Sequence, residues 1–194
     1  MKMKSLGIVS LLLTAAVHAQ IAENYPDATG EIATPGSGPH IDIDSVDVAL
    51  DETEENLTFT INLAGDPIVT NWGKYMIGIR TGPGGATSGN AWGRPINFST
   101  GITHWIGAWA DGEAGGVNLS AFAEGSWSEI KATYSEVEPL ALPVITESSF
   151  SVTIPTALIG YVAGQSFAFD VYTSGGGGGD GPVEALSASD TSIS

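Results

Sequence analysis

The sequence predicts a single all-β domain, a β-sandwich of two antiparallel sheets with a jelly-roll-like arrangement, about 8–10 strands and very little helix. Three observations indicate this fold class. Apolar and polar residues alternate over strand-length runs, turn-forming residues separate the runs, and almost nothing in the chain reads as helix. Because 42 % of the residues are hydrophobic and only 14 % are charged, we expect a packed core rather than a disordered chain.

The clearest strand is predicted at Leu57 to Leu63, where every second residue is apolar. Before it, Ile41 to Leu50 changes parity once near Asp44-Ser45, which predicts a β-bulge. Pro155 to Ile159 is expected to form a short helical turn. Loops are predicted at Gly82 to Asn90 and at Gly175 to Gly179. Further strands are expected at Lys74 to Thr81, Ile102 to Ala110, Val117 to Phe122, within Ser126 to Glu138, at Ser149 to Ile154 and at Gln165 to Tyr172.

The first 19 residues have the pattern of a secretory signal peptide. Lys2 and Lys4 precede an apolar run, and Val17-His18-Ala19 fits a cleavage site before Gln20. The run is shorter than the ~20 apolar residues that a membrane-spanning helix needs. We therefore expect a secreted protein, extracellular or periplasmic, with a signal peptide at 1–19, an irregular lead-in arm at 20–40 and one sandwich domain at 41–194.

The charge balance excludes several classes of partner. The net charge of the full chain is −16, and it becomes −18 without the two leader lysines. Four bases then remain: Lys74, Arg80, Arg94 and Lys131. Such an acidic surface repels phosphate backbones, so we expect no nucleic-acid partner. The chain has no cysteine, which excludes disulfides, thiolate metal sites and thiol catalysis.

The order of several motifs resembles the DOMON-like β-sandwich domains. These motifs are IDIDSVDVALDETEENLTFTINLAGD, NWGKYMIGI, WIGAW, SVTIPTALIG and FAFDVYTSGGGGGDGPVEALS, and together they span about Ile41 to Ser187. The group includes family-nine carbohydrate-binding modules, the C-terminal domain of glucodextranase and haem-binding cytochrome domains. The resemblance implies a module that holds a sugar or a haem, and it does not imply an enzyme.

The tryptophans are the main candidates for a carbohydrate site, because flat aromatic rings stack on the apolar C–H faces of sugars. Trp105 and Trp109 are expected to point to the same face of one strand, about 13 Å apart. Gly107 lies between them, and this spacing suggests a flat platform. The alternative is that one or both belong to the core. Two loop motifs each combine a tryptophan, a glycine and a base, which suits stacking plus hydrogen bonding or, alternatively, loop anchoring. The predicted ligand-binding set is Trp72, Lys74, Trp92, Arg94, Trp105 and Trp109.

Other chemistries find weaker support in the residues. His104 with Met76 is an acceptable axial pair for haem, although a core histidine and a core methionine are the simpler interpretation. The acidic residues around Asp42 to Glu55 suit a solvated face, and they lack the spacing of an EF-hand loop, so a structural calcium ion stays an open alternative. No nucleophile motif or metalloprotease motif is present.

The sequence therefore predicts a secreted, non-catalytic module that binds neutral poly- or oligosaccharides through exposed aromatic residues, with no cofactor and no integral membrane association. Two alternatives remain open at this stage. One is an extracellular structural or interaction protein without sugar binding. The other is a haem-binding domain of the DOMON type.

Overall fold

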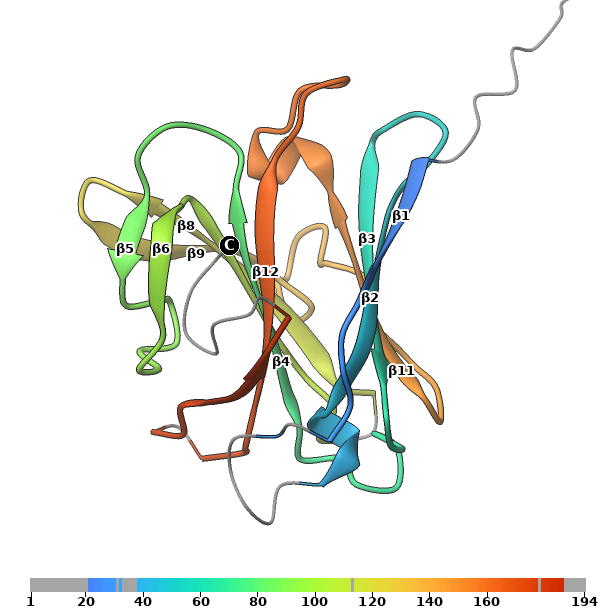
Figure 1. Ribbon diagram of the computed structural model, residues 1–194. Helices are drawn as coiled ribbons and strands as arrows, with labels where there is room; N and C mark the ends of the chain where they lie inside the picture. Colours follow the sequence, from blue (N-terminus) through green and yellow to red (C-terminus); the bar gives the residue numbers. More distant parts are fainter. Residues whose placement is uncertain (1–20, 31, 33–37, 113, 178, 187–194) are drawn as a thin grey trace, which may run out of the picture.

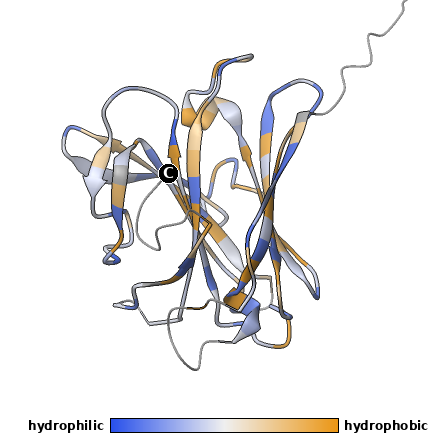
Figure 2. Cartoon of the chain, viewed as in Figure 1, coloured by the Kyte–Doolittle hydropathy of each residue, from blue (hydrophilic) through white to orange (hydrophobic). Residues whose placement is uncertain are grey.

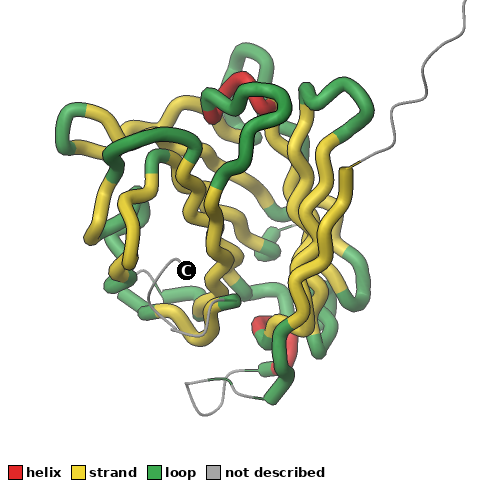
Figure 3. The backbone as a smooth tube through the Cα atoms, turned by 45° about the horizontal axis from the view of Figure 1, so that its top comes forward, coloured by secondary structure: helices red, strands yellow, loops and turns green. Residues whose placement is uncertain are grey.

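The chain folds as an all-β sandwich in which two large antiparallel sheets pack face to face (Figure 1). The computed structural model describes residues 21–30, 32, 38–112, 114–177 and 179–186. The predicted signal peptide lies outside these residues. Within the described residues, helix is confined to two short 3-10 turns, η1 (Pro39–Ile41) and η2 (Thr156–Ile159), as the tube drawing shows (Figure 3). None of the helices in the described part of the chain has the length and hydropathy of a membrane span.

One sheet has five strands in the order β1-β2-β3-β11-β10. Its central strand β3 is the strand predicted from alternation, and its buried residues alternate without a break along its whole length. The register of β2 against β3 shifts between Ile43 and Ser45, which confirms the predicted bulge. The strand bounds are β1 Ile21–Pro26, β2 Ile43–Leu50, β3 Asn56–Leu63, β10 Val144–Ile145 and β11 Ser149–Pro155.

The other sheet has six strands in the order β13-β12-β4-β7-β8-β9. A separate two-stranded ribbon, β5 (Ala86–Ser88) with β6 (Asn97–Ile102), stands beside it (Figure 1). The bounds of the six are β4 Lys74–Arg80, β7 His104–Trp109, β8 Gly116–Ala123, β9 Ser126–Ala132, β12 Ala168–Ser174 and β13 Pro182–Ala185.

Two segments that the sequence predicts to be irregular contain strands. Within the expected lead-in arm, Ile21–Pro26 pairs with β2 along its length and forms an edge of the five-stranded sheet. Within the expected loop of residues 82–90, Ala86–Ser88 pairs with β6. Both strands are short and lie beside prolines or glycines, which lower their local strand signal. Pairing with β2 and with β6 holds these two segments as strands, although their local sequence does not predict strand.

The main core lies between the two large sheets, where the apolar faces of the strands meet (Figure 2). β4 and β7 have buried residues on both of their faces, as does β12. Their second face carries Met76 and Trp105, which pack with Tyr172 of β12 and with Ile96 and Phe98 from the β5–β6 ribbon. This second core covers part of the outer face of the six-stranded sheet, and the candidate site lies on the same face.

Candidate functional site

Four of the six predicted ligand-binding residues line one shallow hollow on the outer face of the six-stranded sheet. Lys74 lies at the start of β4, Trp109 at the end of β7, and Trp92 and Arg94 on the loop between β5 and β6. Asp111 completes the lining. The hollow has a volume of about 330 Å³, near the lower end of the ~300–1,000 Å³ range of ligand pockets. The sequence predicted Lys74, Trp92, Arg94 and Trp109 individually, and the fold brings them together.

Each of the two tryptophans rests on a glycine of the sheet. A Cβ atom at Gly107 would lie 2.1 Å from the Trp92 ring, and a Cβ atom at Gly116 would lie 2.1 Å from the Trp109 ring. Only glycine leaves room for rings this close to the backbone. Both indoles are half-buried, and their ring centroids are 6.3 Å apart at an angle of 43°. The two rings are therefore held against the sheet while part of each faces the hollow.

Tyr134 extends this aromatic surface, although the sequence analysis did not select it. Its ring stacks beside Trp109 at 6.5 Å and is largely exposed. Its hydroxyl donates to Glu129, which raises the pKa of the phenol and keeps it protonated. Asn118 accepts a hydrogen bond from Trp92 Nε1 at 3.2 Å and donates to Glu129 Oε2 at 3.1 Å. These contacts hold the indole of Trp92 in the plane that it occupies.

Lys74 and Asp111 form an ion pair on the rim of the hollow. The ammonium of Lys74 also donates to the carbonyl oxygen of Trp72 at 3.3 Å. Because Asp111 is exposed, one side of the pair faces solvent. The pair offers a hydrogen-bond donor and an acceptor to a ligand, with no net charge.

Arg94 anchors a loop and presents little surface to a ligand, because the residue is only 4 % exposed. Its Nη1 donates to Ser174 Oγ at 2.7 Å and to the carbonyl oxygens of Gly177 at 2.9 Å and Asp180 at 3.0 Å. Burial lowers the pKa of the guanidinium, and the negative charge of Asp180 acts against this shift. The guanidinium carbon lies 5.6 Å from the centre of the Trp92 ring, within reach of a cation–π contact. The loop-anchoring alternative is the better description of Arg94.

Trp72 does not line the hollow. Its ring, 39 % exposed, meets the imidazole of His40 edge to face at 4.2 Å. Its backbone carbonyl accepts the hydrogen bond from Lys74 described above. Trp72 therefore borders the site through its backbone, and its ring belongs to the contact with His40.

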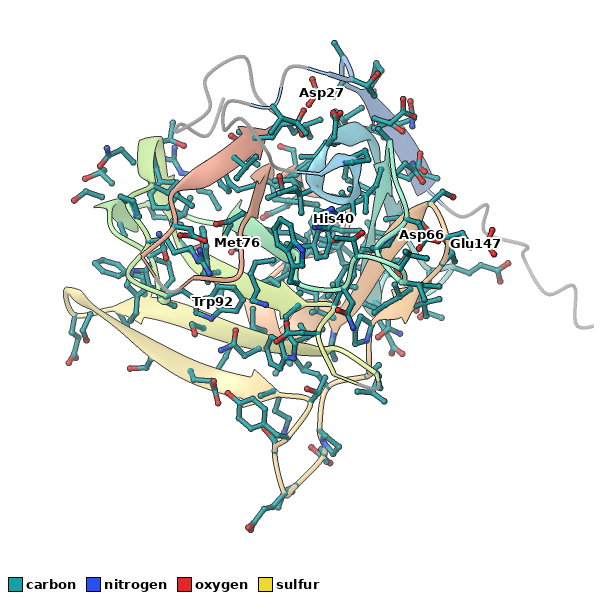
Figure 4. All side chains as sticks on the ribbon, turned by 90° about the horizontal axis from the view of Figure 1, so that it is seen from below. Asp27, His40, Asp66, Met76, Trp92 and Glu147 are labelled. Carbon is teal, nitrogen blue, oxygen red and sulfur yellow. The ribbon has the colours of Figure 1, made fainter. Side chains whose placement is uncertain are left out.

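The prediction that Trp105 and Trp109 form a shared platform is wrong. Trp105 is fully buried in the second core, where its ring lies 6.1 Å from that of Tyr172. The gap at Gly107 is filled by Trp92 from another part of the chain. Strand parity correctly put both residues on one face, but the β5–β6 ribbon covers the half of that face that holds Trp105. Figure 4 shows Trp92 beside the strands of the six-stranded sheet and Met76 further along the same side.

The haem pairing of His104 with Met76 is excluded by the sheet. His104 is paired with Ile79, and Met76 is paired with Gly107, so the two side chains point to opposite faces of the sheet. Met76 is also fully buried, in the second core. A further histidine, His40, is buried in η1 against Trp72. The side chains of His104 and Met76 therefore cannot bind the same iron.

The acidic residues of the first hairpin bind protein groups in this structure. Asp51 accepts hydrogen bonds from Asn56 Nδ2 at 2.7 Å and from the backbone of Glu55 at 2.9 Å, and the bond from Asn56 is the main cause of its lowered pKa. Glu54 accepts from Tyr161 and from the backbone of Gly164. Among the residues that the structure describes, no three His, Asp or Glu side chains gather in a way that could hold a metal ion.

Sequence reasoning missed Asp111, Tyr134 and Asn118 as members of this site. Asp111 lies two residues after Trp109, so its place near that tryptophan was available from the sequence. Asn118 lies on β8 and Tyr134 lies in the turn after β9, and only the pairing of β7 with β8 and of β8 with β9 brings them to the hollow. Comparisons of the chain with protein-family models, with curated proteins and with solved structures found no match.

Proposed function

We propose that this protein is a non-catalytic module that binds neutral carbohydrate in the hollow lined by Trp92 and Trp109. The observation that carries the proposal is that two indoles, held flat by glycines, border the same hollow as a neutral ion pair. The resemblance of the sequence motifs to DOMON-like sugar-binding domains agrees with this proposal.

The chemistry of the hollow suits a sugar better than it suits a charged ligand. Indole faces offer apolar contact to C–H groups, and polar groups around them orient hydroxyls. Lys74, Asp111 and Glu129 supply such polar groups without a surplus of positive charge. The net charge of −16 repels anionic polysaccharides, so neutral glycans are the expected class.

Affinity gel electrophoresis against a panel of neutral glucans, mannans and xylans, followed by calorimetry with oligosaccharides, tests the proposal. Trp109→Ala is expected to weaken binding at least about tenfold, equivalent to about 1.4 kcal/mol. Trp127→Phe is the matched control, because Trp127 packs on Phe122 and donates to the Gly89 carbonyl outside the hollow. Absence of binding to every neutral glycan, or equal binding by Trp109→Ala, would overturn the proposal.

We propose further that the protein is exported, with cleavage between Ala19 and Gln20. The basis is the lysine-flanked apolar run and the small residues before the cut. Mass spectrometry of the protein recovered outside the cytoplasm should find Gln20 as the first residue. Recovery of the uncleaved chain in the cytoplasm alone would contradict the proposal.

A further inference from the structure

A second cavity, distinct from the hollow lined by Trp92 and Trp109, opens between β1 and residues 161–169. It is bounded by β1, β2 and the start of β3 on one side, and by residues 161–169 on the other. Its volume is about 280 Å³. Four aromatic residues contribute to its walls: Tyr25, Tyr161, Phe167 and Phe169. No part of the proposed carbohydrate site contributes to it.

The aromatic rings form angled walls rather than a flat surface. Tyr25 and Phe169 meet at 84° with their centroids 5.0 Å apart, and Tyr161 and Phe167 meet at 88° and 5.9 Å. Phe167 and Phe169 join the two pairs at 6.1 Å. Rings at right angles to one another offer contacts to a bound group from more than one direction. This arrangement suits a compact, rounded group and does not suit a flat sugar ring.

The charges around the cavity are negative. Glu23 lines its mouth and accepts a hydrogen bond from the hydroxyl of Tyr25 at 2.5 Å. This bond raises the pKa of Tyr25 to about 12, so the phenol stays neutral and acts as a donor to Glu23. Glu54 accepts in the same way from the hydroxyl of Tyr161 at 3.1 Å. No lysine or arginine is among the described residues that line the cavity.

We propose that this cavity binds a compact organic cation, a quaternary ammonium group. Such a cation is attracted to aromatic faces by their quadrupoles and gains from nearby carboxylates. It also has no N–H to satisfy. Because the hydroxyls of Tyr25 and Tyr161 already donate to carboxylates, these two phenols need no hydrogen-bond acceptor from the ligand. The proposal is independent of carbohydrate binding.

Calorimetry and ligand-observed proton NMR on the purified protein test the proposal with three probes. These are tetramethylammonium, choline, and 3,3-dimethylbutan-1-ol, which is the uncharged carbon analogue of choline. Both cations are expected to bind, and the analogue is expected to bind at least about tenfold more weakly, the size of one desolvated cation–π contact. Equal binding of the analogue would reduce the cavity to an apolar pocket and overturn the proposal, as would absence of binding by either cation at millimolar concentration.

Two variants locate the binding in this cavity. Glu23→Gln removes a charge from an exposed position, and Phe169→Leu removes an aromatic face while keeping an apolar side chain. Each is expected to weaken choline binding by about threefold to tenfold. Glu52→Gln removes an exposed charge outside the cavity lining and is the matched control. Melting temperatures confirm folding, and binding that neither cavity variant weakens contradicts the assignment.

Discussion

Single residues on the outer face of the six-stranded sheet differ in role according to what covers them. Trp105 and Trp109 have the same strand parity, yet Trp105 is fully buried and Trp109 lines the hollow. The indole Nε1 of Trp105 has no hydrogen-bond partner among the described residues, which marks the second core as an apolar site. The two tryptophans should therefore respond differently to substitution.

Trp105→Ala is expected to lower the free energy of unfolding by about 3–5 kcal/mol, because it empties the middle of the second core. Trp105→Phe should cost less, since it keeps most of the volume and removes an unpaired donor. Urea unfolding followed by circular dichroism measures both. A Trp105→Ala variant that unfolds at the same urea concentration as the wild type would contradict the assignment to the core.

His40 links the stability of the fold to pH. Its ring is buried against Trp72, neither ring nitrogen has a hydrogen-bond partner among the described residues, and burial lowers its pKa. Below an unfolded-state pKa of about 6.5 the unfolded chain binds a proton that the folded chain resists. The contribution of His40 to stability is therefore full above this pH and is lost as the pH falls below it.

The test compares the wild type with His40→Phe between pH 7.5 and pH 5. The difference in unfolding free energy should change in favour of the variant as the pH falls, by at most about 1.4 kcal/mol per pH unit. His104, whose pKa is also lowered by burial, is present in both proteins, so its effect cancels. Parallel pH profiles for the two proteins would show that His40 is not responsible.

At the scale of elements, the site depends on the close approach of the β5–β6 loop to the sheet. Gly107→Ala would place a Cβ atom within 2.1 Å of the Trp92 ring. We expect the indole to be displaced, with a changed tryptophan emission spectrum and weaker glycan binding, comparable to that of Trp92→Ala. Gly82→Ala is the matched control, because open space surrounds that position. Unchanged emission in Gly107→Ala would contradict the packing described here.

The same loop is tied to the glycine-rich loop after β12 through Arg94. Arg94→Met removes its three hydrogen bonds to Ser174, Gly177 and Asp180. Hydrogen bonds from a charged group contribute about 1.5–3 kcal/mol each, so the glycine-rich loop should open locally once they are lost. Limited proteolysis with subtilisin and mass spectrometry should then find faster cleavage within residues 175–181. Cleavage at the wild-type rate would show that other contacts hold this loop.

For the whole molecule, repulsion among like charges is the dominant electrostatic effect. The chain carries 22 acidic and 6 basic residues, and only two salt bridges form among the described residues. Raising NaCl from about 10 mM to about 300 mM shortens the Debye length from ~30 Å towards ~6 Å. We expect the melting temperature to rise by a few degrees, and KCl should act equally because screening depends on ionic strength. A fall in melting temperature with salt would contradict this account.

Local sequence predicts those parts of the fold whose signal is local. The alternation from Leu57 to Leu63 and the parity slip near Asp44-Ser45 both appear in β3 and β2 as expected. β1 and β5 were not predicted, because they form strands by pairing with β2 and β6 and not through a pattern in their own sequence. For the candidate site, the combination of tryptophan, glycine and base in residues 92–94 pointed to a loop that lines the hollow. The contribution of Tyr134 depends on strand pairings that no local pattern encodes.

The sequence by itself determined that this protein is an acidic, cysteine-free chain with strands in which apolar and polar residues alternate. Such strands form sheets that must pack their apolar faces against each other. The sequence could determine this because side-chain direction in a strand follows from residue parity alone. The tertiary structure decided which apolar positions stay accessible. The β5–β6 ribbon buries Trp105, Gly107 admits Trp92, and β1 together with residues 161–169 encloses a second aromatic cavity. These outcomes depend on packing between segments far apart in the chain, which residue parity cannot specify.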